Sequence, residues 1–574
     1  LTCVAAAVVV VLVLICSHFV SGSCPSVTRF DPNLEPNSST PTCFCDPAGI
    51  DGRSVEIQCF YGSTIANLSQ AIVAVKNSGK QVTSVVMNNM DFPDNEPFNI
   101  TRRSLAGVET TLRNLSIVAC VLLRVPEAIQ ALHSLNALEL QHNKISAITR
   151  KDLETVAKTL RHLDISENVL TTIENGTLDM MPGLETLILS NNHLNDSVVV
   201  HLKELISLAD GEGIFSSLDR LEVLDLSKNK IGNISRTMFA PLPSLSFLDL
   251  NLNMIEDIDD GSFAGMPNIT KLKIEGTYLD NLRPNMFVNL SNLEYLQLGW
   301  NELKTIPEGA FTHTPNLKVL SLNSNGLLQT LDPSALKNLK QLEILNLSYT
   351  SVVTIEPLLF NGTKLKVLDL SSGELERLPA DAFDFTPDLE TLFVNNTKLI
   401  SLPDTIFDRL KRLQEINLSY NQWLCDTTLG WLSSWLRNSA AIVQNRNYVS
   451  CEWPIRLRGI SVASLNDSEF VDYEYDDNGG QQQNETLTSE TAVALPEAAG
   501  HADSDGGGHK PCNIGGHVHA NDQSVEMGTI ITIVVVILVV SILVVLTVIV
   551  LVMKRRRRQK ERDTNAPNSH LPNR

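Results

Sequence analysis

The chain has 574 residues, 43% of them hydrophobic, and a formal net charge of −20. That length could hold several globular domains. The negative charge disfavours nucleic-acid binding, which needs clustered Lys and Arg to meet the phosphate backbone. The acidity is uneven, because residues 461–527 carry thirteen acidic residues against Lys510 alone, whereas residues 554–574 carry eight basic and two acidic ones.

The amino-terminal segment begins with an apolar run from Val4 to Cys16, followed by small residues around 20–23. This pattern is typical of a secretory signal peptide, so residues 1–22 are predicted to be removed. The lack of an initiating Met indicates that the first residues of this peptide are missing. Four cysteines lie in the next segment, residues 23–60, and their spacing permits three disulfide pairings. They are Cys24, Cys43, Cys45 and Cys59.

Residues 82–423 contain about fourteen copies of the pattern L-x-x-L-x-L-x-x-N-x-L, most of them 24 residues apart. Clean copies begin at Leu221 (LEVLDLSKNKI) and Leu293 (LEYLQLGWNEL). A fixed period in the twenties with this pattern is typical of leucine-rich repeats. It predicts an α/β repeat solenoid, a horseshoe with a parallel sheet on its concave face. The Asn is expected to bond backbone groups inside the solenoid. Met90 and Gly373 cannot replace it, and we expect weaker packing there.

Two further columns follow the repeat. Seven phenylalanines recur at its period and are interpreted as a stacked core on the convex side, with an aromatic ligand stripe as the alternative. They are Phe239, Phe263, Phe287, Phe311, Phe360, Phe383 and Phe407. Cys120 occupies an Asn position, where a small buried residue with a structural role is expected.

Residues 24 to about 460 resemble the typical-type extracellular leucine-rich-repeat proteins, which include the Slit, Toll-ectodomain, Capricious/Tartan and neuronal leucine-rich-repeat groups. The first cysteine cluster resembles their amino-terminal cap, and the resemblance implies the pairs Cys24–Cys45 and Cys43–Cys59. Residues 424–460 resemble their carboxy-terminal cap, with Cys425–Cys451 as one pair. Thr427 and Asp472 stand where that cap has two more cysteines.

Solvent-facing positions on the predicted concave strands are candidates for ligand binding, because side chains alternate across a strand. The candidate ligand-binding residues are Phe247, Tyr295, Trp300, Ile344, Tyr349 and Phe393. Aromatic residues at successive concave positions favour a protein-binding patch, since Tyr and Trp anchor interfaces. The alternative is a sheet face that merely tolerates aromatic residues.

The chain has fifteen N-x-S/T sequons, which suits a secreted surface. The predicted glycosylation sites are Asn67, Asn99, Asn175, Asn233, Asn268, Asn289, Asn346, Asn361 and Asn417. Two of them, Asn346 and Asn417, are predicted strand positions, and glycans there would direct recognition toward the middle repeats.

The carboxy-terminal part predicts a membrane anchor. Residues 461–527 are acidic and poor in apolar residues, and are predicted to be a disordered stalk. Within them Cys512 could pair between two chains, giving a dimer, or carry an unrelated adduct. Residues 528–553 carry no charge and are long enough to span a bilayer. The basic residues that follow predict a short cytoplasmic tail, 554–574, in a type I single-pass plasma-membrane protein with extracellular repeats.

We find no H-E-x-x-H, G-x-S-x-G or Gly-rich phosphate-loop motif, so no enzymatic activity, cofactor or metal is expected. The resemblance implies protein recognition at a cell surface. The first hypothesis is an adhesion or recognition receptor without its own signalling domain, whose partner is a protein ligand or a cell-surface protein, including a second copy of itself. The alternatives are an accessory co-receptor in innate sensing or ligand presentation, and a non-catalytic subunit that anchors an enzyme.

Overall fold

The computed structural model describes residues 43–48, 53–60, 63–90, 100–195, 215, 217–236, 238–239, 242–472, 474–475 and 481–482. These residues all belong to one compact unit, Leu1–Glu485. The predicted signal peptide, Cys24, Asn99, Cys512, the span 528–553 and the tail 554–574 lie outside the described residues. The same holds for most of the predicted stalk.

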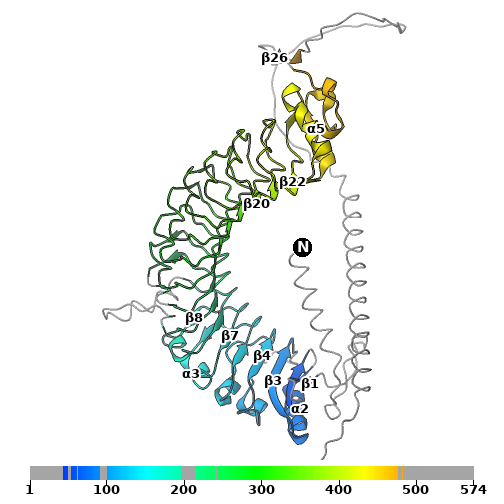
Figure 1. Cartoon of the computed structure of the whole chain (residues 1–574). Coiled ribbons are helices and arrows are strands. Elements are labelled where there is room, and N and C mark those ends of the chain that lie inside the picture. The colour runs from blue at the N-terminus through cyan, green and yellow to red at the C-terminus, as the bar shows by residue number, and fades with distance from the viewer. Residues whose placement is uncertain are drawn as a thin grey trace, which may run out of the picture. The chain divides into compact units, whose positions relative to one another are not determined.

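The repeats form the predicted parallel sheet, which lines the inner side of an arc (Figure 1). Each of the fourteen copies contributes one strand, paired in register with the strand of the next copy. The strands are β3 (Gln81–Asn88), β4 (Asn114–Val118), β5 (Ala137–Glu139), β7 (His162–Asp164), β9 (Thr186–Ile188), β10 (Val223–Asp225), β12 (Phe247–Asp249), β14 (Lys271–Lys273), β15 (Tyr295–Gln297), β17 (Val319–Ser321), β19 (Ile344–Asn346), β20 (Val367–Asp369), β21 (Thr391–Phe393) and β22 (Glu415–Asn417).

The outer side of the arc is built from turns and short elements. Within the described repeats, three pairs of two-residue strands lie outside the main sheet: β6 (Ala147–Ile148) with β8 (Thr172–Ile173), β11 (Asn233–Ile234) with β13 (Asp257–Ile258), and β16 (Thr305–Ile306) with β18 (Thr330–Leu331). The short helices of the repeats are η2 (Arg102–Leu105), η3 (Glu127–Ala131), α3 (Arg150–Leu153) and η4 (Leu178–Met180). With only turns on this side, the side chains inside the solenoid must supply most of the packing.

The ladder of asparagines closes the interior turns as expected. Asn325 is fully buried, and its amide nitrogen donates to the carbonyl oxygens of Leu298 and Leu322 at 2.9 and 2.8 Å. Its side-chain oxygen accepts the Leu303 N–H at 3.1 Å. Cys120 takes a ladder position, where its N–H donates to the Asn143 side chain at 3.0 Å. Burial raises the pKa of the Cys120 thiol to about 11, which suits a structural role.

Gly373 marks a close approach between neighbouring turns. A Cβ at this position would lie 2.7 Å from the carbonyl oxygen of Thr350, so the two backbones approach too closely for any side chain. The N–H of Glu374 donates to that carbonyl at 3.1 Å. Met90, the other exception, is buried. The weaker packing expected at these two positions stays a prediction.

The phenylalanine column is a stacked core. Phe239, Phe263, Phe287 and Phe311 are fully buried, and their consecutive ring centroids are 6.2, 6.3 and 6.4 Å apart. Phe215 extends the stack at 6.1 Å from Phe239, a member that the sequence pattern did not reveal. Because these rings are buried and packed on one another, the core interpretation is confirmed and the ligand stripe is excluded.

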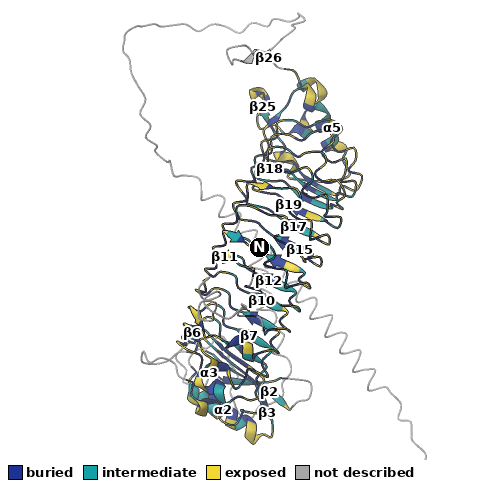
Figure 2. Cartoon of the chain, turned by 90° about the vertical axis from the view of Figure 1, so that its left-hand side faces the viewer, coloured by how far each residue is buried: buried dark blue, intermediate teal, exposed yellow. Residues whose placement is uncertain are grey.

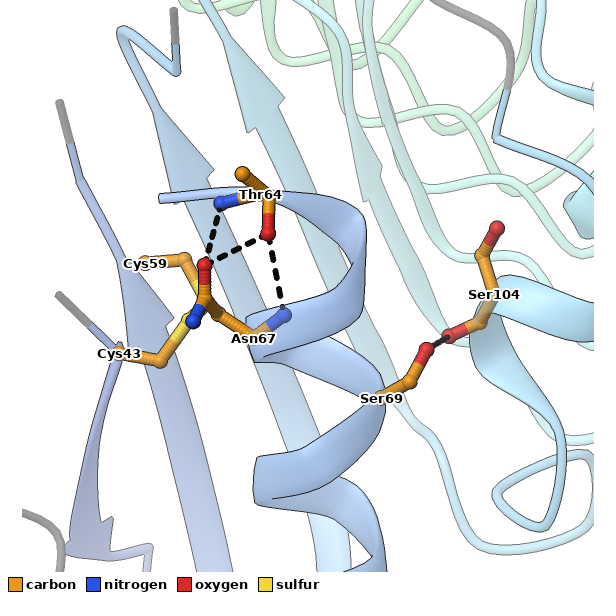
Figure 3. The surroundings of a disulfide bond; sticks show 6 residues. All are labelled: Cys43, Cys59, Thr64, Asn67, Ser69 and Ser104. Atoms are coloured by element: carbon orange, nitrogen blue, oxygen red, sulfur yellow. Dashed lines mark hydrogen bonds between the residues drawn. A yellow bond between two sulfur atoms is a disulfide. The ribbon is translucent and has the colours of Figure 1, made fainter. Parts of the chain in front are cut away.

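The amino-terminal end of the sheet is covered by a disulfide-linked cap. Strand β1 (Cys43–Pro47) pairs antiparallel with β2 (Ser54–Cys59), and β2 pairs in parallel with β3. A disulfide joins Cys43 to Cys59 (Figure 3). Cys45 is half-buried in β1, and the partner implied for it, Cys24, lies outside the described residues.

Helix α2 (Ile65–Asn77) follows this pair of strands. Thr64 and Asn67 form a capping box at its start (Figure 3): the Asn67 oxygen accepts the Thr64 N–H at 2.8 Å, and the Asn67 N–H donates to the Thr64 hydroxyl at 3.3 Å. Exposed and buried residues alternate along the helix (Figure 2). Its buried face consists of Leu68, Ala71, Ile72 and Val75. The cap thereby shields the apolar interior of the first repeat.

The carboxy-terminal end is closed by a second cap. Strand β24 (Ile442–Gln444) adds to β22, β23 (Trp423–Leu424) pairs with β25 (Cys451–Trp453), and a disulfide joins Cys425 to Cys451. Trp435 of helix α5 (Gly430–Asn438) packs on Phe407, the last ring of the phenylalanine column, with the two ring centroids 4.6 Å apart. The remaining elements are η5 (Thr427–Leu429), η6 (Arg446–Tyr448), η7 (Ile455–Leu457), η8 (Val462–Ser464), η9 (Asp467–Glu469), β26 (Glu474–Tyr475) and β27 (Gln481–Gln482).

Thr427 and Asp472, the two positions at which this cap lacks cysteines, are in contact. The Thr427 hydroxyl donates to the Asp472 carboxylate across 45 residues of chain. A polar contact therefore joins the same two points that a disulfide joins in the caps this segment resembles.

We expect Thr427→Cys combined with Asp472→Cys to form a disulfide and to stabilise the cap by about 4 kcal/mol on the chain-entropy estimate. Thiol titration and thermal unfolding under reducing and non-reducing conditions would measure both effects. Thr428→Cys with Asp472→Cys is the matched control, because the Thr428 hydroxyl bonds to Asp426 instead. Equal disulfide formation in the two variants would contradict a specific Thr427–Asp472 contact.

Candidate protein-binding face

The first and third residues of each strand face away from the core. In β15, for example, Tyr295 and Gln297 are half-buried while Leu296 between them is fully buried. The parallel register stacks these positions into two columns that run along the sheet. Among the candidate residues, Phe247, Tyr295 and Ile344 lie in the column of first positions, and Phe393 lies in the column of third positions.

Side chains in the column of third positions close the turns after the strands, a role that the sequence pattern did not suggest. Asp or Asn recurs there, and its side-chain oxygen accepts the N–H two residues later, which closes the turn after the strand. The distance is 2.9 Å in Asp225 and Asp369 and 3.0 Å in Asp249. Asn346 and Asn417 make the same bond at 2.9 and 3.2 Å. The Asp residues of this column therefore close turns and also carry the negative charge of the sheet face.

Trp300 and Tyr349 do not lie on strands, which corrects the expectation that they are concave strand positions. Trp300 comes three residues after the end of β15, at φ +51°, and Tyr349 three residues after β19, at φ +56°. The residue before each ladder position has this left-handed conformation, from His142 to Tyr420. The turn begins directly after the third leucine of the pattern, which is Leu298 in the repeat of Trp300, so these side chains stand on the edge of the sheet.

Large apolar side chains gather along this edge over five consecutive repeats. We call the set the apolar edge; each member is between 48% and 64% exposed. Its members are Leu252, Met254, Tyr278, Trp300, Leu327 and Tyr349. Four of them were not recognised from the sequence. A signal for them exists, because each lies at the left-handed position or within three residues after it.

The opposite edge of the sheet is charged. Glu294 and Lys318, the residues just before β15 and β17, form an ion pair at 2.8 Å, and Glu343 and Lys366, just before β19 and β20, form another at 2.9 Å. Because these charges neutralise one another and are well hydrated, this edge offers little to an apolar partner. The two edges therefore differ in chemistry, and the apolar edge is the better candidate for recognition.

The middle of the sheet holds a compact group of charged and aromatic residues. The Lys273 ammonium lies 3.0 Å from the Asp249 carboxylate and 5.2 Å from the centroid of the Phe247 ring. Burial raises the pKa of Asp249, although the Asn251 N–H and Lys273 oppose this. Burial likewise raises the pKa of Tyr295. Phe247 is thus covered by a cation, and Tyr295 is the more available aromatic residue.

The predicted glycosylation sites differ in accessibility. Exposed ones are Asn175, Asn233, Asn268, Asn289 and Asn361. Asn67 and Asn346 are half-buried. Asn417 is buried, and its amide nitrogen, the atom that would carry a glycan, donates to Gln444 at 3.3 Å. None of the exposed five belongs to the apolar edge.

Among the described residues, no three His, Cys, Asp or Glu side chains are placed to hold a metal ion. A shallow cavity of about 600 Å³ lies where the last repeat meets the cap, lined in part by Leu402, Asp404 and Trp431. No helix among the described residues is both long and apolar enough to cross a membrane.

Comparison with known proteins agrees with the repeat architecture. The leucine-rich repeat family model matches residues 133–194, 208–255, 248–303, 267–327, 300–352, 315–363 and 363–422. Together with the in-register sheet and the asparagine ladder, these matches show that residues 133–194 and 208–422 are leucine-rich repeats.

Two curated relatives share part of this region. Human oligodendrocyte-myelin glycoprotein is 36% identical over 108 residues, which cover 18% of this chain and 24% of the relative. Vasorin of Xenopus tropicalis is 30% identical over 187 residues, covering 25% and 28%. The match thus spans about a quarter of the length of each relative. Among solved structures, one described as the TLR13–ssRNA13 complex aligns with a TM-score of 0.51 at 20% identity, covering 72% of this chain and 64% of that one.

Proposed function

We propose that this chain is a cell-surface recognition protein that holds a protein ligand on its concave sheet and apolar edge, without catalysis. The observation that carries the proposal is the placement of Trp300 and Tyr349. Both are bulky, about 60% exposed and held at a left-handed φ. That conformation costs a residue other than Gly roughly 1–2 kcal/mol.

The fold does not require large residues at these positions. Equivalent places in neighbouring repeats are held by Gly276, Ser324 and Ser372. A bulky aromatic side chain there adds strain and leaves apolar surface in water, so its benefit must come from something that covers it. Trp and Tyr are the residues most often found at the energetic centre of protein interfaces.

Other observations support a protein ligand at a cell surface. The two disulfides suit an oxidising, extracellular compartment. The sequence predicts a signal peptide and a membrane span on residues outside the described ones. One relative is by name a glycoprotein of myelin, and the predicted glycosylation sites suit such a surface. The net charge of −20 disfavours a nucleic acid as the ligand.

The test is proximity labelling on cells that display the full chain, followed by affinity measurement with each labelled surface protein. Trp300→Ser with Tyr349→Ser should weaken binding by about 30-fold or more, as expected for hot-spot residues. Serine already occurs in the same row, so the variant should fold normally. Phe385→Ser is the control, because Phe385 is 38% exposed and is not part of the apolar edge.

Mixing displaying cells with labelled cells that lack the chain separates the kinds of partner. Clusters that contain only displaying cells would indicate binding between copies of the chain. Capture of a soluble ligand without clusters would favour the co-receptor alternative, and capture of a hydrolase would favour the enzyme-anchoring one. Equal binding by wild type and by the double serine variant would overturn the assignment of the apolar edge.

A further inference from the structure

Glu275 is an acidic residue beside the apolar edge, and the Lys273 ammonium offsets its charge only in part. It follows β14 by two residues, is half-buried, and forms no ion pair with any described residue. The nearest base along the chain, Lys273, is already engaged with Asp249 and the Phe247 ring. Burial raises the pKa of Glu275, because water solvates the charged carboxylate only incompletely. A carboxylate in this situation gains when a cation approaches it.

The backbone places this carboxylate among the apolar edge residues. The Leu252 N–H donates to the Glu275 carbonyl at 2.7 Å, and the N–H of Gly276 donates at 3.0 Å to Gly299, the residue before Trp300. Leu252 and Trp300 therefore belong to the repeats on either side of Glu275. The side chain of Leu252 leans over Gly276, where an added Cβ would meet its methyl group at 2.6 Å. Along the stack, an acidic residue thus lies between an aliphatic and an aromatic member of the apolar edge.

The surrounding turns are acidic as well. The turns 251–256, 275–280 and 299–304 together carry a net charge of −3. Their acidic residues are Glu256, Glu275, Asp280 and Glu302, and their one basic residue is Lys304. Lys304 pairs with Asp280 at 3.0 Å. The remaining three carboxylates have no ion pair among the described residues. A partner that is itself acidic would be repelled here, and a basic one attracted.

We propose that the apolar edge binds a protein segment that presents an Arg or Lys side chain next to apolar residues, with the basic group at Glu275 and its neighbours on Leu252 and Trp300. This inference rests on the proposed function and states the chemistry of its ligand. A guanidinium suits the place well, because it can pair with a carboxylate while its flat face stacks on an indole. Charge complementarity and the exposed apolar strip together select this class of partner.

The experiment selects peptides from a phage-displayed library of random 12-residue sequences on cells that display the full chain, after depletion on cells without it. The enriched peptides should combine Lys or Arg with aliphatic or aromatic residues. Glu275→Gln should weaken their binding about tenfold, as should Leu252→Ser, and Trp300→Ser should weaken it about 30-fold. Glu222→Gln is the matched control, since Glu222 is an exposed acid on the opposite, charged edge.

Several results would overturn the inference: enrichment of acidic or uncharged peptides, recovery of no peptides beyond those found on cells without the chain, or binding that is indifferent to Glu275→Gln. Failure of this inference can be told apart from failure of the proposed function. A labelled native partner that depends on Trp300 and Tyr349 but not on Glu275 would leave the function standing and remove the basic anchor. A native partner indifferent to all three would remove both.

Discussion

Replacing Phe287 by alanine is expected to lower the free energy of unfolding by roughly 3–5 kcal/mol. The ring is fully buried, 6.3 Å from that of Phe263 and 6.4 Å from that of Phe311. The hydrogen-bonded sheet fixes the spacing between repeats, so the neighbouring rings cannot move together to fill the space. A cavity would remain, and its cost adds to the lost burial of the ring. Denaturant unfolding of the purified protein would measure the difference.

The same variant should weaken the solenoid locally before it weakens the whole. In a repeat protein the stability is close to a sum over neighbouring repeats, so amide hydrogen exchange should accelerate first around residues 263–311. Phe385→Ala is the control, because that ring is already 38% exposed and its loss should cost less, about 1–2 kcal/mol. A uniform change in exchange along the chain, or equal effects of the two substitutions, would contradict a locally stacked core.

Asn325→Ala should be nearly as damaging, with an expected loss of about 3–4 kcal/mol. The substitution removes three hydrogen bonds at once and leaves the Leu303 N–H and the carbonyls of Leu298 and Leu322 without these partners. Buried groups left unpaired cost more than the bonds themselves, because water cannot reach them. Unfolding by denaturant would give the size of the effect.

Hydrogen exchange at the Leu303 amide tests the prediction for Asn325→Ala at a single hydrogen bond. The Leu303 N–H should lose most of its protection in Asn325→Ala, while amides several repeats away keep theirs. Asn316→Ala is the control, since Asn316 is exposed and makes a single bond to the Ser291 carbonyl at 2.8 Å. Full protection of Leu303 in the variant would show that this interior turn does not depend on the asparagine.

The sequence by itself determined the architecture, because every repeat obeys the same local rule. The L-x-L alternation places one strand per copy, the Asn supplies the bonds of the interior turn, and the period forces Phe263, Phe287 and Phe311 into one stack. Cysteine positions and the resemblance to known caps anticipated the Cys43–Cys59 and Cys425–Cys451 bonds. These features depend on periodicity and local chemistry, which a linear pattern records.

The tertiary structure decided where each exposed residue stands relative to the others. The pattern could not show that the chain turns directly after its third leucine, so it placed Trp300 and Tyr349 on the concave strands instead of the edge. It could not show that Asp249 caps a turn and binds Lys273, which leaves Glu275 without an ion pair. Nor could it show that Gly373 permits two backbones to meet. Each of these depends on contacts between neighbouring repeats, and the distances across the stack are set by packing and not by sequence order.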